Sequence, residues 1–149
     1  MKKLIIILTI AAFLQTTVIP IDLILLILIC RAYIKSEKSN LYLAFAFGLL
    51  VGHLNLAPFG IISLIYLTFV AVTQALSRLR LAGNPLLIVP VVFVYASLDQ
   101  LMSSVFMHET MEFSRIIISA SLSLPLLYLI RLWEERFIVQ KEIKLKYKR

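Results

Sequence analysis

Six polar side chains interrupt apolar segments of this chain and are the residues best placed to do chemistry: His53, Asn55, Asp99, Gln100, Ser103 and Arg115. Asp99 and Ser103 are four residues apart, so they lie on one face of a helix. A carboxylate inside a bilayer costs about 2.5–3.5 kcal/mol and is normally turned inward or paired. We therefore expect Asp99 to pair with Arg115, with His53 as a candidate third member.

Three interpretations of these six residues stay open. They meet water near the lipid headgroups, they form a network that holds helices together, or they line a pocket for a ligand or partner. An enzyme is not expected, because the chain has no HExxH, CxxC, GxSxG or P-loop lysine motif. Nor do we expect a cofactor or metal, since His53 and His108 have no clustered Cys or Asp beside them.

The elements that must position these side chains are membrane helices. The chain of 149 residues is 61% hydrophobic and only 15% charged, whereas about a quarter of a typical soluble domain is charged. Backbone groups in lipid must be satisfied within the segment, which favours helices. We expect an all-α integral membrane protein, a compact six-helix bundle over residues 1–130 with a basic tail over 131–149 that is helical at its start. The six apolar segments are 4–19, 21–34, 41–56, 59–76, 86–106 and 113–130.

Charge predicts the orientation of these segments. Fourteen of the fifteen basic residues fall at one end of the bundle, and Arg115 alone falls at the other. The positive-inside rule then places both termini in the cytoplasm. A five-span alternative, with residues 4–30 fused into one helix kinked at Pro20, would move Lys2 and Lys3 outside and break this rule. The six polar residues of the first paragraph, here named the outward polar cluster, lie in the outer half, and the inner half is expected to be almost purely apolar.

Small residues predict close helix contacts. Gly48 and Gly52 form a GxxxG pattern, and Ala71 and Ala75 form a weaker version of it. Such a face packs within the bundle or against another protein's helix, and internal packing is favoured. Gly60 is expected to serve the turn into the fourth segment.

The tail has two open interpretations. It lies along an anionic membrane surface, or it is a solvated tail that only sets topology. Nucleic-acid binding is not expected, because the net charge of +7 is explained by membrane topology. The membrane-surface interpretation rests on the basic residues Lys141, Lys144, Lys146, Lys148 and Arg149.

Several short motifs follow one another along the chain: Leu14-Gln15, Pro20 and Asp22, the pattern Gly48-Leu-Leu-x-x-His-Leu-x-x-x-Pro-Phe-Gly60, Asp99, and the ending PLLYLIRLWEERF. In their order and spacing these motifs resemble the rod shape-determining protein MreD family, over almost the whole length of the chain. The chain departs from the family's pattern at Gly52, beside His53, where the family usually carries an aspartate.

The resemblance implies a non-catalytic scaffold of the bacterial rod complex, multi-pass in the inner membrane. Such proteins associate with MreC, and through it with the MreB filament and the peptidoglycan synthases. For this chain we expect the small-residue face at Gly48 and Gly52 to receive a partner's helix. The outward polar cluster would meet that partner outside, and the tail would meet anionic lipid or the filament.

The main alternative is the substrate-binding subunit of an energy-coupling-factor vitamin transporter, which MreD-like proteins resemble in fold. Such subunits open a polar, aromatic-lined pocket to the outside and dock through spaced small residues in their first helix. Here Ala11 and Ala12 are adjacent, and the single tryptophan, Trp133, lies on the cytoplasmic side of the expected topology. A pore would need a polar stripe through a whole helix, which the segments lack.

Overall fold

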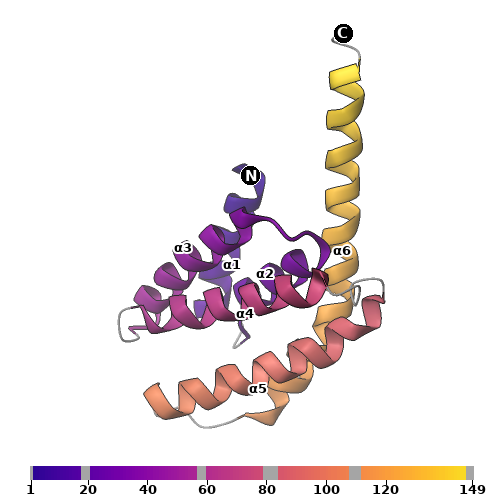
Figure 1. The fold of residues 1–149 in the computed structure, drawn as a ribbon. Helices are drawn as coiled ribbons and strands as arrows, with labels where there is room; N and C mark the ends of the chain where they lie inside the picture. The colour runs from indigo at the N-terminus through magenta and orange to yellow at the C-terminus, as the bar shows by residue number, and fades with distance from the viewer. Residues whose placement is uncertain (1, 18–20, 57–59, 79–83, 108–111, 147–149) are drawn as a thin grey trace.

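The computed structural model describes residues 2–17, 21–56, 60–78, 84–107 and 112–146, with side chains in the last helix described as far as Arg136. These residues form six α-helices (Figure 1), as predicted. The helices are α1 (Lys2–Thr17), α2 (Leu23–Ile34), α3 (Lys38–Leu54), α4 (Ile61–Arg78), α5 (Ile88–Met107), which follows the short 3₁₀ helix η2 (Pro85–Leu87), and α6 (Phe113–Lys146).

The central element is α2, which contacts α1, α3, α4, α5 and α6. Its sequence, LILLILICRAYI, is apolar on nearly every side, as is typical of a helix surrounded by protein. With 12 residues it is about 18 Å long, which is shorter than the roughly 30 Å hydrocarbon core of a bilayer. α2 is therefore a core helix that its neighbours enclose.

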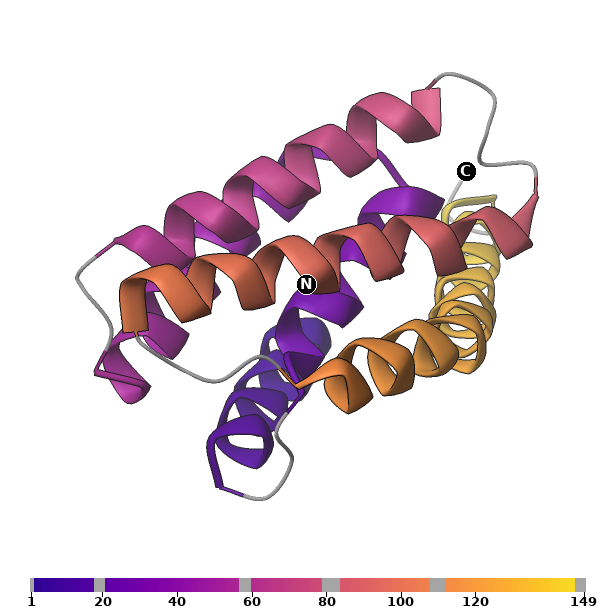
Figure 2. The same ribbon diagram turned by 90° about the horizontal axis from the view of Figure 1, so that it is seen from below.

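Four of the helices that surround α2 form two pairs. α3 and α4 lie side by side, and α5 runs beside the first part of α6 (Figures 1 and 2). The two pairs meet through a stacked contact between the rings of Phe69 on α4 and Tyr95 on α5, whose centroids are 4.7 Å apart.

α6 changes direction along its length. Its first part follows α5, and the remainder turns away from α3, α4 and α5 and carries the C-terminus beyond the bundle (Figures 1 and 2). Pro125 lies inside this helix. A proline there removes one backbone hydrogen bond and clashes with the preceding turn, which bends the helix. The helix also continues to Lys146, well past the expected end of the membrane segment at residue 130.

Among the described residues, three helical segments are long and apolar enough to cross a membrane by length and composition: Ile61–Arg78, Pro85–Met102 and Phe113–Arg136. Two more, Leu4–Gln15 and Leu23–Ile34, are apolar but shorter. Large apolar side chains also cover the outside of α1, α5 and α6, among them Ile6, Val105 and Ile117. A bilayer is the natural solvent for such a surface. These features support a transmembrane protein, with three clear spans among the six predicted.

Candidate functional site

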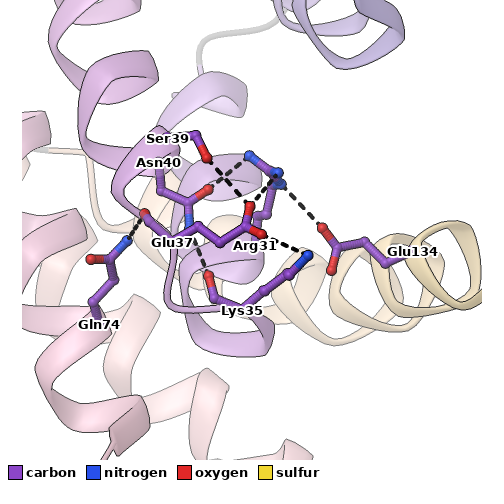
Figure 3. A network of polar contacts seen from close by, with 7 residues as sticks. All are labelled: Arg31, Lys35, Glu37, Ser39, Asn40, Gln74 and Glu134. Atoms are coloured by element: carbon purple, nitrogen blue, oxygen red, sulfur yellow. Dashed lines mark hydrogen bonds and ion pairs between the residues drawn. The ribbon is translucent and has the colours of Figure 1, made fainter. Parts of the chain in front are cut away.

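The most extensive polar site surrounds Arg31 at the C-terminal end of α2 (Figure 3). Only 8% of the Arg31 side chain is exposed. Its Nη1 donates a hydrogen bond to Asn40 Oδ1 at 2.7 Å, and its Nε donates to Glu134 Oε1 at 3.2 Å. Nη2 lies 3.5 Å from Glu37 Oε2. One buried guanidinium thus connects α2 with α3, with α6 and with the loop between α2 and α3.

The neighbours of Arg31 fix the backbone of that loop. Asn40 Nδ2 donates to the Lys35 carbonyl at 2.7 Å, and Gln74 Nε2 on α4 donates to the Glu37 carbonyl at 2.7 Å. We call the residues of Figure 3 the Arg31 network, and the end of the bundle that holds them the Arg31 end. Four helices meet there through side-chain hydrogen bonds. The network consists of Arg31, Lys35, Glu37, Ser39, Asn40, Gln74 and Glu134.

The charges of the Arg31 network balance each other. Arg31 and Lys35 carry two positive charges, and Glu37 and Glu134 carry two negative charges. Lys35 Nζ lies 2.7 Å from Glu37 Oε1. Hydrogen bonding from Lys35 holds the pKa of Glu37 below its usual value, and the charges of Lys35 and Arg31 act in the same direction. Because the cations and carboxylates satisfy one another, this arrangement is suited to joining helices rather than to binding a charged substrate.

The expectation of an almost purely apolar inner half is wrong at this end. Arg31, Asn40 and Gln74 are all buried polar residues. The sequence suggests for Arg31 only a contribution to the positive charge of this end, whereas in the structure it pairs with Glu37 and Glu134. The available signal was its position within the apolar run of α2, because a charge there normally has a buried partner.

A second polar site lies at the opposite end of the bundle. Tyr66, on α4, is fully buried, and its hydroxyl donates to Asp22 Oδ1 at 2.6 Å. Gln15 Nε2, on α1, donates to the same oxygen at 3.0 Å, and Gln15 Oε1 accepts from the Ile24 backbone N–H at 3.1 Å. Asp99, on α5, is close enough to Tyr66 to interact with it electrostatically. We call Gln15, Asp22, Tyr66 and Asp99 the Asp22 network.

The structure does not bring the outward polar cluster together as one site. Arg115 Nε pairs with Glu112 Oε2 at 2.7 Å, whereas Asp99 was the partner expected from the sequence. Gln100 makes two hydrogen bonds to the Glu112 backbone, at 3.0 and 3.1 Å. These contacts join the α5 and α6 ends, whereas Asp99 belongs to the Asp22 network.

The remaining members of the outward polar cluster lie at the C-terminal end of α3 and along α5. His53 and Asn55 are exposed at the end of α3, where the Asn55 backbone N–H caps the helix by donating to Val51 O. The side chain of Ser103 lies outside the described residues. Among the described residues, no group of three or more His, Cys, Asp or Glu side chains could hold a metal.

The predicted GxxxG face packs α3 against α4. A Cβ placed on Gly48 would lie 2.5 Å from Ser63 Cα, and one on Gly52 would lie 3.7 Å from Ile62 Cβ. Packing within the bundle is therefore confirmed, and the expectation that Gly48 and Gly52 receive a partner's helix is wrong because α4 already occupies their face. Gly60 has a φ of +87° directly before α4, in agreement with its expected role in the turn.

Two further sets of predicted site residues lie elsewhere: one set is on the exposed side of α4, and the other is near the C-terminus. Ala71 and Ala75 are exposed on α4. Lys141, Lys144 and Lys146 belong to the last turns of α6, although their side chains are not described. Lys148 and Arg149 lie outside the described residues.

Comparison of the chain with known protein families, with curated proteins and with solved structures finds no match.

Proposed function

We propose that this chain is a non-catalytic scaffold of the bacterial rod complex, similar to MreD, in the inner membrane with both termini in the cytoplasm. The observation that carries this function is the Asp22 network. Gln15, Asp22 and Asp99 each belong to the pattern that resembles MreD, and Asp99 is far from the other two in the sequence. Gln15 and Asp22 are joined by a hydrogen bond beside the buried hydroxyl of Tyr66, and Asp99 interacts with Tyr66 electrostatically. In the pattern that resembles MreD, these polar residues hold helices together, which favours a structural role over catalysis.

The orientation is supported by the basic residues at the Arg31 end. Lys38 and Arg78 are exposed there, and Arg78 Nε donates to Ser36 Oγ at 3.2 Å. The positive-inside rule places this end in the cytoplasm. The Asp22 network then lies in the outer half of the membrane.

The partner in this proposal is an MreC-like protein with a single membrane helix, through which the chain reaches the MreB filament and the peptidoglycan synthases. Because α4 covers Gly48, this helix must pack elsewhere. Leu64, Thr68, Ala71 and Ala75 are all exposed, and their spacing places them on one face of α4. The two alanines would let a partner backbone approach closely.

The alternative, a substrate-binding subunit of an energy-coupling-factor transporter, is less well supported. Ala11 and Ala12, the small residues of α1, are buried inside the bundle. They therefore offer no surface for docking to a transducing subunit. Trp133 packs against the core near the Arg31 end, away from the Asp22 network.

Affinity purification from native membranes in mild detergent, with mass spectrometry of the recovered proteins, tests this function. We expect recovery of an MreC-like protein and peptidoglycan synthases. Replacing both Ala71 and Ala75 with leucine should reduce that recovery, while the control Ala46→Leu, an exposed alanine on α3, should not. Recovery of paired ATPases with a transducing membrane subunit would overturn the proposal in favour of the transporter.

A further inference from the structure

The C-terminal part of α6 is too long to be explained as a membrane span alone. The helix has 34 residues, which corresponds to about 51 Å, against roughly 30 Å for the hydrocarbon core. The later part of α6 leaves the direction of α3, α4 and α5 (Figures 1 and 2), and Pro125 lies inside the helix. We call residues 126–146 of α6 the arm. If α4 and α5 cross the membrane, the arm is inclined toward the membrane plane. The segment Phe113–Arg136, which is long and apolar enough for one span by length and composition, is then divided by the bend at Pro125.

The root of the arm is held firmly by the bundle. Trp133 packs against the hydrophobic core, and Glu134 accepts a hydrogen bond from the buried Arg31. Both contacts lie at the Arg31 end, so they fix where the arm leaves the bundle and in which direction. The arm is thus a continuation of a packed helix and keeps one orientation relative to α2.

The side of the root that does not face the bundle carries large apolar side chains beside the exposed ion pair of Arg131 and Glu135. Tyr128, Leu129 and Leu132 are 66%, 64% and 42% exposed. An apolar surface at this position, followed by a positively charged helix, is typical of a helix that lies in the interface of a membrane.

Charge complementarity identifies the surface that the arm contacts. Residues 131–149 contain seven basic and three acidic residues. Lys38 and Arg78 are also exposed at the Arg31 end. Positive charge at both the root and the far end of the arm matches an anionic lipid surface.

We propose that the arm lies on the membrane as an in-plane helix and binds anionic phospholipid headgroups through Lys141, Lys144 and Lys146. The bend at Pro125 and the Arg31–Glu134 contact keep it at the surface. A straight α6 would carry these lysines away from the bilayer. This inference does not depend on the binding of an MreC-like protein, so the two can fail separately.

The test uses the full chain in nanodiscs, with a fluorophore on Val139→Cys; the natural Cys30 is buried and is not expected to react. Quenching by a lipid-linked nitroxide and by aqueous iodide reports whether the arm contacts lipid or water. Discs of phosphatidylcholine alone are compared with discs that also contain phosphatidylglycerol. Replacement of Lys141, Lys144 and Lys146 by glutamine removes three charges, and replacement by arginine is the matched control that keeps them.

We expect lipid quenching in phosphatidylglycerol discs for the parent and the arginine variant. The glutamine variant should lose it, with a binding equilibrium weaker by roughly 100-fold for three neutralised lysines. Iodide quenching of the parent in phosphatidylglycerol discs would overturn the proposal and leave an arm free for an acidic protein. Lipid quenching that is equal in both kinds of disc would overturn the role of anionic headgroups. The measurement is repeated with the fluorophore on Gln140→Cys, to check that the result does not come from a local change caused by the label on Val139→Cys.

Discussion

At the scale of single residues, Arg31 is a buried charged side chain that connects α2 with α3 and α6. Its guanidinium is buried and shared among Asn40, Glu37 and Glu134. Burying a charge is costly, and its partners would be left uncompensated if it were removed. The Arg31 side chain therefore stabilises the observed packing of α2, α3 and α6, because an arrangement that separated these helices would leave a buried charge unpaired.

We predict that Arg31→Met lowers the free energy of unfolding in detergent by about 3–5 kcal/mol, the usual cost of breaking a buried ion pair. Arg131→Met is the matched control. It breaks the exposed pair with Glu135 and should cost at most about 1 kcal/mol. Denaturant titration of the purified variants measures both. Equal effects would contradict the buried role of Arg31.

Glu37 should make stability depend on pH. Its pKa is lowered in the folded protein from an ordinary value of 4.5, first of all by the hydrogen bond from Lys35. Its contribution is therefore fully present above that value and is lost as pH falls through the lower folded value. The stability difference between the parent and Glu37→Gln should be largest near neutral pH and should narrow below pH 4.5. Lys35→Met should weaken this dependence, and an unchanged profile would count against it.

Gly48 and Gly52 should respond differently to the same substitution. A Cβ on Gly48 would lie 2.5 Å from the Ser63 backbone, whereas one on Gly52 meets the Ile62 side chain at an ordinary 3.7 Å. Gly48→Ala should destabilise by about 1–3 kcal/mol through overpacking. Gly52→Ala should be neutral or stabilise by up to about 1 kcal/mol through helix propensity. Thermal unfolding of both variants decides the point, and an equal loss in both would refute the close α3–α4 contact.

The roles of the glycines could be predicted from the sequence, and the partner of Arg115 could not, for physical reasons. Gly60 and the GxxxG pair could be predicted because backbone freedom and the absence of a side chain are local properties. The partner of Arg115 could not be predicted, because Asp99 and Glu112 were both available as acceptors. Glu112 lies three residues away along the chain and is the nearer one. Which acceptor an arginine uses depends on where the helix ends meet.

At the scale of elements, the apolar runs predicted six helices because Pro, Gly and polar residues separate them. The central position of α2 could not be predicted, since an apolar helix in lipid and one surrounded by protein have similar sequences. The continuation of α6 to Lys146 was only partly predicted, because charged residues end a membrane segment without ending a helix.

The bend in α6 gives an element-scale prediction. Pro125→Ala restores a backbone donor and removes the ring clash, so α6 should straighten. Spin labels at Val139→Cys and Leu64→Cys, the latter an exposed position on α4, report the distance from the arm to the bundle by pulsed electron resonance. We expect this distance distribution to shift in the Pro125→Ala variant. The exposed Leu129→Ala is the control that should leave it unchanged.

At the scale of the whole molecule, two polar networks hold the bundle at opposite ends of α2. Hydrogen bonds of the Asp22 network join α1, the start of α2 and α4, and those of the Arg31 network join α2, α3, α4 and α6. Between them the contacts are mainly apolar. Composition and charge predicted the all-helical class and one end rich in cations. They could not predict the two networks, because these depend on helices far apart in the sequence.

The measurement that most directly tests this account is labelling of two cysteines at opposite ends of α3 in bacterial cells. His53→Cys lies at the Asp22 end and Lys38→Cys at the Arg31 end, and both positions are exposed. A membrane-impermeant maleimide should label His53→Cys in intact cells and Lys38→Cys only after permeabilisation. Labelling of Lys38→Cys in intact cells, or of both positions alike, would contradict a bundle whose Arg31 end faces the cytoplasm.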